Sequence, residues 1–229
     1  MKIAVFGTGM VGAAVAGAFA ERGHDVTVGT RDPEATVART EAGPMGGAPF
    51  AEWHAGHPGV RVATFSDAAA GSELIVNATN GAGSLAALAA AGEDNLAGKV
   101  IVDIANPLDF SAGFPPSLNP VNTDSLGEQI QRTFPAARVV KTLNTMNAAI
   151  MVDPASVADG DHSVFVSGDD AEAKGVVRGL LEELGHRDII DLGDITTARG
   201  TEMLLPVWLR LWGALGHADF NFKVARAGR

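Results

Sequence analysis

The 229-residue sequence contains no cysteine and no tyrosine. The absence of cysteine excludes disulfides, thiol nucleophiles and cysteine-ligated metals. The absence of tyrosine excludes the Tyr–Lys mechanism of short-chain dehydrogenases, in which the hydroxyl protonates the substrate. Basic residues are few: 17 Lys and Arg stand against 27 Asp and Glu, which gives a formal charge of −10. Because nonspecific phosphate binding needs a basic face, we expect neither nucleic acid nor a membrane as a partner.

Long hydrophobic runs are missing as well. The longest apolar stretch, residues 203–215, is interrupted by Pro206 and Arg210 and is too short to span a bilayer. The sequence opens on a predicted strand and lacks the pattern of a signal peptide. We therefore expect a cytoplasmic protein, with one sizeable hydrophobic core for its length.

The most specific motif is a glycine-rich turn between a strand and a helix. Residues 3–6 predict a short buried strand, and the alanine-rich residues 13–20 predict a helix packed on a sheet. In this setting the turn predicts a pyrophosphate site, because the glycines allow a tight turn, close approach of the phosphates and close helix packing. The residues of the turn are Gly7, Thr8, Gly9, Met10, Val11 and Gly12.

The end of the second predicted strand, residues 24–29, indicates which dinucleotide binds. A site selective for NAD carries Asp or Glu at this point to bind the ribose 2′-hydroxyl. The sequence instead has Thr30 and Arg31, whose hydroxyl and guanidinium can bind a 2′-phosphate. We therefore predict NADP(H) as the cofactor. The alternative is that Arg31 is a solvated residue paired with a nearby acid such as Asp32.

Strand and helix patterns alternate along most of the chain, which predicts an α/β, Rossmann-type, doubly wound and mainly parallel sheet. Further strands are expected at residues 60–65, 74–78, 99–104 and 138–143, and helices at 33–42, 66–71, 83–91 and 125–134. Residues 43–59 are expected to form a long loop. It is either a lid over the second substrate or an insertion that Trp53 pins to the body of the protein.

The remaining residues predict an extension of the sheet and terminal helices. A strand, a helix and a strand are expected at 162–167, 171–184 and 188–192, followed by a helix over 196–215. We therefore divide the chain into an NADP-binding domain, residues 1–150, and a substrate or dimer region, residues 151–229. The apolar stripe of the last helix contains Trp208 and Trp212 and must pack on its own sheet, on a second subunit or over a planar ligand. One turn apart, Arg199 and Glu202 are expected to form a structural ion pair.

Three polar turns follow predicted strands and should converge near the nicotinamide, because ligands of open α/β sheets lie beyond the carboxyl ends of the strands. The asparagines of these turns can bind a carboxamide or a ring carbonyl, or only their own backbone, and for the cluster we favour a site. The turns are Ala78-Thr79-Asn80, Ala105-Asn106-Pro107 and Asn144-Thr145-Met146-Asn147. Lys141, inside a predicted strand, is a candidate proton donor for a small substrate. The spacing of His54 and His57 would suit a metal, but no third ligand is near in sequence, so we expect no metal site.

These motifs resemble the reductases that couple NADP(H) to the deazaflavin coenzyme F420, and also the oxidoreductase domain of the six-transmembrane metalloreductases. The resemblance runs nearly end to end, through the glycine-rich turn and residues 29–31, 103–107, 139–144, 168–170 and 199–202. It implies hydride transfer between NADP(H) and F420, an eight-stranded type of sheet, and a homodimer joined partly through the terminal helices.

The resemblance also implies a role for individual positions. The pyrophosphate contacts become Thr8, Gly9, Met10 and Val11, the 2′-phosphate contacts Thr30 and Arg31, and the nicotinamide ribose contacts Ala78, Thr79 and Asn80. The residues against which the deazaflavin would lie, named here the deazaflavin shelf, become Asn144, Met146, Asn147 and Ala148, with the turn at Asn106 and Pro107 beside them. The family usually has His at position 144 and Pro at 147, and a further basic residue shortly after the Ser/Thr-Arg pair. This chain therefore has a more polar shelf and lacks one of the usual phosphate contacts.

Direct hydride transfer between two organic cofactors requires no side chain as acid, base or nucleophile, so we expect no catalytic residue. Two other functions stay open. One is an NADPH-dependent reductase of a flavin, a ferric chelate or a small imine or carbonyl. The other is a non-enzymatic NADP(H) redox sensor that signals through the face formed by Trp208 and Trp212.

Overall fold

The computed structural model describes residues 1–43 and 47–227, and its centre is one eight-stranded sheet. The strand order is β10-β9-β8-β5-β4-β1-β2-β3. The strands of this sheet are β1 (Lys2–Phe6), β2 (Asp25–Thr30), β3 (Arg61–Thr64), β4 (Leu74–Asn77), β5 (Val100–Asp103), β8 (Arg138–Thr142), β9 (Ser163–Ser167) and β10 (Asp188–Asp191). The predicted Rossmann-type fold is confirmed.

Six strands of the sheet, β1 to β5 and β8, run parallel, so their carboxyl ends share one edge. The predicted strand–helix–strand extension is confirmed, and it runs in the opposite direction, because β9 pairs antiparallel with β8. The chain therefore leaves β8 and enters β9 at the same edge of the sheet. The domain division at residue 150 stays a prediction, since β9 and β10 add to the same sheet.

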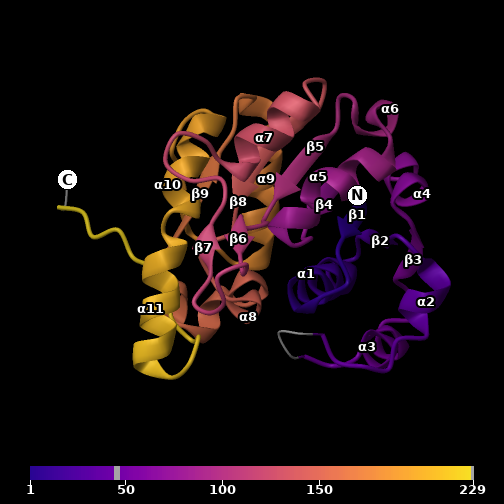
Figure 1. Ribbon diagram of the computed structural model, residues 1–229, viewed down its shortest axis with the longest axis horizontal. Coiled ribbons are helices and arrows are strands. Elements are labelled where there is room, and N and C mark those ends of the chain that lie inside the picture. The colour runs from indigo at the N-terminus through magenta and orange to yellow at the C-terminus, as the bar shows by residue number, and fades with distance from the viewer. Residues whose placement is uncertain (44–46, 228–229) are drawn as a thin grey trace.

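Helices cover both faces of the sheet (Figure 1). On β1, Ile3 and Val5 belong to the core under α1 and α9, whereas Ala4 and Phe6 belong to the core under α4, α5 and α7. The helices are α1 (Met10–Glu21), α2 (Pro33–Val37), α3 (Phe50–Gly56), α4 (Phe65–Ala70), α5 (Gly81–Ala91), α6 (Glu93–Leu96), α7 (Leu126–Thr133), α8 (Ala148–Val152), α9 (Ala171–Leu184), α10 (Ala198–Glu202) and α11 (Leu205–Leu215). Short 3-10 turns are η1 (Pro154–Ser156), η2 (Ala158–Gly160) and η3 (Ile195–Thr197).

Two predicted helices are wrong in extent. The helix expected over residues 33–42 ends at Val37. The helix expected over 196–215 is broken between α10 and α11, where Pro206 occupies the first turn of α11. Proline removes a backbone donor and disfavours helical geometry in the residue before it, which explains the break.

The expected loop over residues 43–59 contains helix α3, so the prediction of a loop is wrong for residues 50–56. Phe50 at the start of α3 is buried, and Trp53 packs against the same core as α1. Of the two alternatives, an insertion held to the body of the protein by Trp53 therefore describes this segment better than a lid over the second substrate. Residues 44–46 of the expected loop lie outside the described residues.

The two ends of the sheet carry different elements (Figure 1). Helix α11 and the extended C-terminal segment lie at one end, and α2 and α3 lie at the other. A small hairpin, β6 (Leu108–Asp109) and β7 (Ser117–Leu118), packs beside α11, where the rings of Phe114 and Trp212 are 5.9 Å apart. Among the described helices, none has the length and apolar character that crossing a membrane requires.

Candidate cofactor and substrate site

The glycine-rich turn joins β1 to α1 and leaves no room for side chains at two of its glycines. Gly7 has φ +123°, and a Cβ there would lie 2.4 Å from the Ala78 carbonyl oxygen. A Cβ at Gly12 would lie 2.1 Å from the carbonyl oxygen of Gly7. At Gly9, by contrast, a Cβ would meet nothing within 4 Å. The backbone of Gly9 is therefore open to close approach by a ligand.

The N-terminus of α1 lacks a side-chain cap. Gly9 is the N-cap residue, and the first turn contains no acidic residue. Asp32, Asn80, Ser125 and Asp170 each accept a backbone hydrogen bond at the start of another helix. Free amides and the helix dipole attract an anion, so this end of α1 suits a pyrophosphate.

The tip of β2 presents one of its two predicted phosphate ligands to solvent. Arg31 is exposed, and no ion pair of Arg31 occurs within the described ranges. Thr30 is buried, and its hydroxyl lies 2.9 Å from the hydroxyl of Thr36. Asp32 accepts a hydrogen bond from the Ala35 amide as the cap of α2. The alternative pairing of Arg31 with Asp32 is therefore not found among the described residues, and the Thr30 hydroxyl is already bonded inside the protein.

Buried polar groups hold the turn that follows β4. The Thr79 hydroxyl donates to Asn77 Oδ1 at 2.7 Å, and Asn77 Nδ2 donates to Asp103 Oδ1 at 2.9 Å. A Cβ at Gly81 would lie 2.2 Å from the Asn106 carbonyl oxygen. The turns after β4 and β5 are thus in direct contact, as the sequence predicts for one sheet edge.

The turns after β5 and β8 are joined by a reciprocal pair of amides. Asn106 Nδ2 donates to the Asn144 carbonyl at 2.9 Å, and Asn144 Nδ2 donates to Asn106 Oδ1 at 3.0 Å. Asn80 caps α5, and Asn147 caps α8. The structure therefore brings the asparagines of the three turns to one edge, but each side chain already has a partner in the protein.

The residues of the predicted deazaflavin shelf are mostly buried. Asn144 is 3% exposed, Met146 5% and Ala148 4%, and Pro107 is buried as well. Asn147 is half-buried and also donates to the Ala218 carbonyl at 3.4 Å. Of the four residues predicted to form the shelf, Asn147 is therefore the one that remains partly exposed. Gly9, Met10, Arg31 and Asn80 on the predicted cofactor side are exposed.

Lys141 lies beneath this edge and is fully buried. Its ammonium is 2.6 Å from Asp103 Oδ2 and 2.8 Å from Glu202 Oε1, and it donates to the Ala105 carbonyl at 2.8 Å. Burial by itself lowers the pKa of this lysine, but the two carboxylates outweigh it and hold the pKa above its usual value. A buried, charged lysine with three partners is not placed to protonate a substrate.

The ion pair expected between Arg199 and Glu202 is wrong. Glu202 faces Lys141 and also accepts from the backbone amides of α7 at Leu126 and Gly127. Arg199 Nε donates instead to Glu128 Oε2 at 2.8 Å. A fully buried ammonium needs compensating carboxylates more than a half-buried guanidinium does, so Glu202 pairs with the distant Lys141 and not with Arg199.

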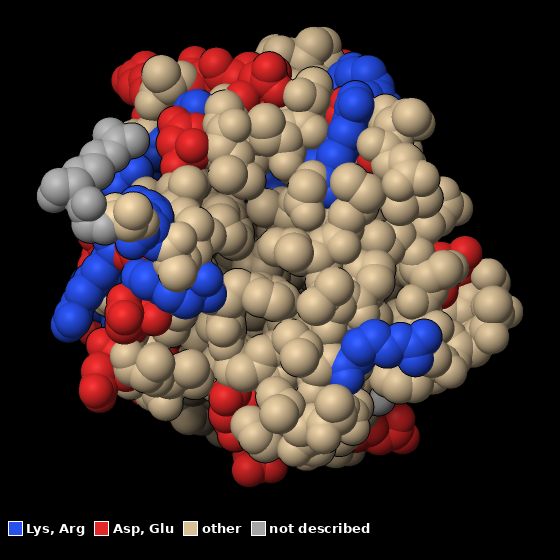
Figure 2. Space-filling model, turned by 90° about the vertical axis from the view of Figure 1, so that its left-hand side faces the viewer, with Lys and Arg blue, Asp and Glu red and all other residues tan. Residues whose placement is uncertain are grey.

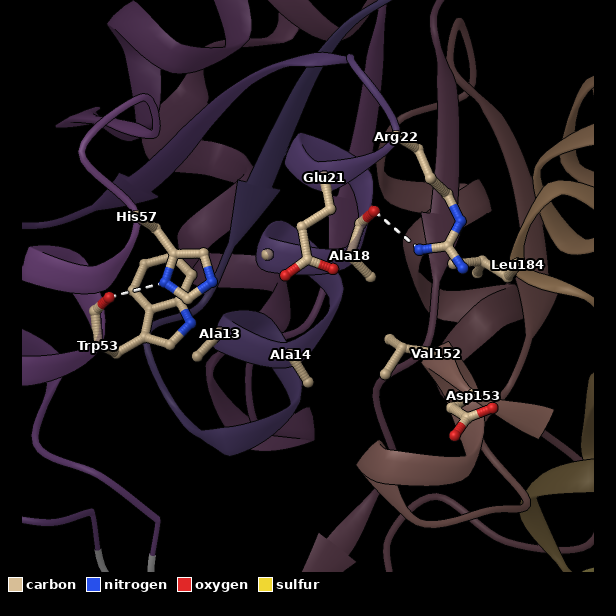
Figure 3. Close-up of a pocket in the computed structure, with 11 residues that line it drawn as sticks. Ala13, Ala14, Ala18, Glu21, Arg22, Trp53, His57, Val152, Asp153 and Leu184 are labelled. Atoms are coloured by element: carbon tan, nitrogen blue, oxygen red, sulfur yellow. Dashed lines mark hydrogen bonds between the residues drawn. The ribbon is translucent and has the colours of Figure 1, made fainter. Parts of the chain in front are cut away.

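A cavity of about 400 Å³ lies along α1 but away from the predicted cofactor residues, none of which lines it. Figure 3 shows Trp53 and His57 on one side of α1, with Val152 and Asp153 on the other. His57 Nδ1 donates to the Trp53 carbonyl at 2.7 Å, and His54 Nε2 donates to the Val60 carbonyl at 2.9 Å. Both imidazoles thus serve the local structure of α3.

The sequence did not predict a supporting role at this edge for four residues, Arg39, Asn77, Asp103 and Glu202, although residues 103 and 202 lie in motifs that carry the resemblance. Asn77 and Asp103 end the apolar runs LIVN and VIVD. A polar residue that closes a buried strand was the available signal. Arg39 and Glu202 gave no local signal, because their partners are distant in sequence.

A family model and three of the similar proteins share one description. The family model described as "NADP oxidoreductase coenzyme F420-dependent" matches residues 2–107. A crystal structure from Arthrobacter sp. FB24, provisionally named an F420-dependent NADP-reductase, is 70% identical, with a TM-score of 0.94 over 99% of this chain and 100% of that one. The F420-dependent NADP reductase of Methanothermobacter thermautotrophicus is 28% identical over 217 residues, which are 92% of this chain and 89% of the relative.

The similarity also extends to a longer protein. Metalloreductase STEAP3 of Rattus norvegicus is 29% identical over 215 residues, which are 90% of this chain but 38% of the relative. The chain also spans about half, 53%, of the F420-dependent NADP reductase of Methanocaldococcus jannaschii. The structure of an imine reductase of Aspergillus terreus is 23% identical and has the same fold, with a TM-score of 0.63. The matched region is 94% of this chain and 62% of the imine reductase chain.

Proposed function

The chain belongs to the family of coenzyme F420-dependent NADP oxidoreductases, and we propose that it transfers a hydride between NADP(H) and the deazaflavin F420. The observation that carries the NADP(H) half is the uncapped, glycine-lined start of α1 beside an exposed Arg31. The F420 half is supported by the names of the relatives and by the convergence of three polar turns at the same edge.

In this proposal the chain binds and orients two ligands. The amides from Thr8 to Val11 would hold the pyrophosphate, and Arg31 the 2′-phosphate, with Thr30 supporting the tip of β2. Ala78, Thr79 and Asn80 would contact the nicotinamide ribose. The bound nicotinamide and deazaflavin supply the hydride donor and acceptor, so the protein contributes proximity, orientation and exclusion of water.

The second ligand would lie over the linked turns after β5 and β8. The amide pair between Asn106 and Asn144 fixes the distance between these turns, and Asn147 offers a half-buried polar group beside them. The burial of Lys141 argues against a small imine or carbonyl as the natural acceptor, because such a substrate needs a proton donor. Reduction of a flavin or a ferric chelate, and a sensor without turnover, are outcomes that the experiment below separates.

We also propose that the protein is a homodimer joined through α11. The outer side of this helix exposes Val207 (51%) and Leu215 (50%), and the neighbouring hairpin segment exposes Phe110 (50%) and Phe114 (67%). Figure 2 shows this side as a broad, mostly uncharged surface that a basic side chain crosses, with most of the other Lys, Arg, Asp and Glu toward its rim. Such a face fits a second copy better than solvent.

The proposed activity is tested by mixing the protein with NADPH and oxidised F420 and following the visible deazaflavin band. We expect rapid loss of the band with NADPH and little loss with NADH. FMN and a ferric chelate serve as competing acceptors in parallel. No loss of the band despite tight NADPH binding would contradict the F420 assignment, and turnover of FMN alone would replace it with a flavin reductase.

A matched pair of glycine variants tests the phosphate site. Gly9→Ala adds a Cβ that meets nothing in the protein, so the variant should fold, but the methyl group would stand where the pyrophosphate approaches. Gly179→Ala adds the same atom within α9, also into open space. We expect Gly9→Ala to weaken NADP⁺ binding at least about tenfold, the loss of one charge-assisted hydrogen bond, and Gly179→Ala to leave it unchanged. Equal affinities in the two variants would place the phosphates elsewhere.

A further inference from the structure

We propose that Arg39 is a second guanidinium ligand of the cofactor 2′-phosphate, an inference that rests on the NADP(H) binding proposed above. Arg39 follows the C-cap residue of α2, at a position where the sequence predicts continuing helix. Because α2 ends early, the side chain is free to turn back toward the glycine-rich turn.

The backbone at Arg39 is held from two sides. The bond between the buried hydroxyls of Thr30 and Thr36 ties α2 to the tip of β2, and the Arg39 amide donates to the Thr36 carbonyl at 3.2 Å. The Arg39 carbonyl accepts from the Ala51 amide at 3.1 Å at the start of α3. These bonds place residue 39 at the edge where β2 ends.

The side chain of Arg39 reaches the cofactor turn itself. Its Nη2 donates to the Thr8 carbonyl at 2.8 Å. Its Cζ lies 5.6 Å from the centre of the Phe50 ring, which is 2% exposed and therefore a fixed support. A hydrogen bond and a cation–π contact thus hold the guanidinium against the turn between β1 and α1.

The guanidinium has donors left for a ligand. Within the described part of the chain its Nε is buried and has no hydrogen-bond partner. Unpaired buried donors are uncommon in proteins, and a phosphate is the acceptor that the planar fork of an arginine fits best. The Thr8 carbonyl takes up one of the five N–H groups.

The position of Arg39 favours a contact with the 2′-phosphate of the cofactor over a contact with its pyrophosphate. The pyrophosphate site lies at the first amides of α1, whereas the backbone of Arg39 is bonded to Thr36, whose hydroxyl is bonded to that of Thr30 at the end of β2. The Thr30 hydroxyl that the sequence assigned to the 2′-phosphate is bonded to Thr36. Arg39 would therefore join Arg31 as a ligand of the 2′-phosphate.

The experiment measures the dissociation constants of NADP⁺, NAD⁺ and 2′,5′-ADP by calorimetry for the wild type and Arg39→Met. We expect the variant to bind NADP⁺ and 2′,5′-ADP about 10- to 100-fold more weakly, because a charged phosphate contact is lost. Binding of NAD⁺, which lacks the 2′-phosphate, should change less than about threefold. Arg61→Met is the matched control: Arg61 is an exposed residue of β3 paired with Asp25 at 2.8 Å, and its loss should leave all three affinities unchanged.

A purely structural role gives a different result. If Arg39 only braces the glycine-rich turn, NADP⁺ and NAD⁺ weaken in parallel, and this outcome or an unchanged NADP⁺ affinity overturns the inference. Arg39→Lys retains the positive charge but not the planar guanidinium, so it should recover part of the preference for NADP⁺ over NAD⁺. If Arg39→Met folds poorly, the ratio of the two affinities is measured in Arg39→Lys instead. A wild-type protein that binds NAD⁺ as tightly as NADP⁺ would refute the cofactor assignment itself, whereas a failure with F420 alone would leave Arg39 unaffected.

Discussion

Replacing Lys141 with methionine should destabilise the protein far more than replacing any exposed lysine. The ammonium of Lys141 compensates the carboxylates of Asp103 and Glu202, which are 0% and 2% exposed. Removal of one partner from a buried ion pair costs about 3–5 kcal/mol, because the remaining charge is left without compensation. Here two carboxylates remain, so this range is a lower estimate. In a chain of this size the midpoint of thermal unfolding should fall by about 6–20 °C.

Lys223→Met is the matched control for this experiment. Lys223 also lies between two carboxylates, 2.7 Å from Asp161 and 3.1 Å from Asp188, but it is exposed to solvent. Solvent screens this pair, so we expect a much smaller change in the midpoint. Calorimetric or fluorescence-monitored unfolding compares the two variants.

The pH dependence of the two variants gives a second check. The stabilising charge of Lys141 is present at neutral pH, because its pKa is raised in the folded protein, and it is lost only when the pH rises through that value. In Lys141→Met the deficit in stability should therefore persist across neutral pH and shrink only when the pH rises toward that value. A deficit equal to that of Lys223→Met, or one that vanishes at neutral pH, would refute the reasoning.

Two further predictions concern acid stability and assembly. Burial lowers the pKa of His186 to about 4, so the unfolded state binds the proton first between pH 6.5 and 4, and stability should fall by up to about 3 kcal/mol over this range. In His186→Gln the free energy of unfolding, measured at a series of pH values, should fall less steeply as the pH decreases. An unchanged slope would show that other groups cause the loss of stability. Val207→Asp combined with Leu215→Asp should halve the molar mass measured by light scattering, because two charges enter the apolar face of α11. A wild-type monomer, or a double variant that stays dimeric, would rule out this face as the dimer contact.

The buried cluster of Lys141, Asp103 and Glu202 also shows why the sequence alone makes Lys141 a candidate proton donor and the structure does not. From the sequence, Lys141 is a charged residue inside an apolar strand, and its side chain could point to either face of the sheet. The structure points it at Asp103 of the neighbouring strand and at Glu202 of α10. A side chain in a two-sided parallel sheet is buried whichever way it points, so the sequence could have predicted the need for a carboxylate partner but not its identity.

The asparagines illustrate a similar limit. The sequence correctly brings Asn80, Asn106 and Asn144 to one edge, because the direction of parallel strands follows from their right-handed connections. It leaves open whether each amide binds a ligand or the backbone. The structure shows Asn106 and Asn144 bonded to each other and Asn80 at the start of α5. Which partner an amide takes depends on the distance between turns, which only packing determines.

The sequence by itself determined the Rossmann-type sheet and the glycine-rich turn, because both follow from local rules. A buried strand, a helix and glycines that can adopt positive φ or approach another backbone closely are all defined within residues 2–21. The absence of an acid at the tip of β2 is likewise a local fact. Tertiary structure alone decided the antiparallel entry of β9, the burial of Thr30, the partners of Glu202 and the approach of Arg39 to Thr8. These features join segments far apart in the chain, and a buried charge or hydroxyl takes whichever partner the packing of those segments brings within reach.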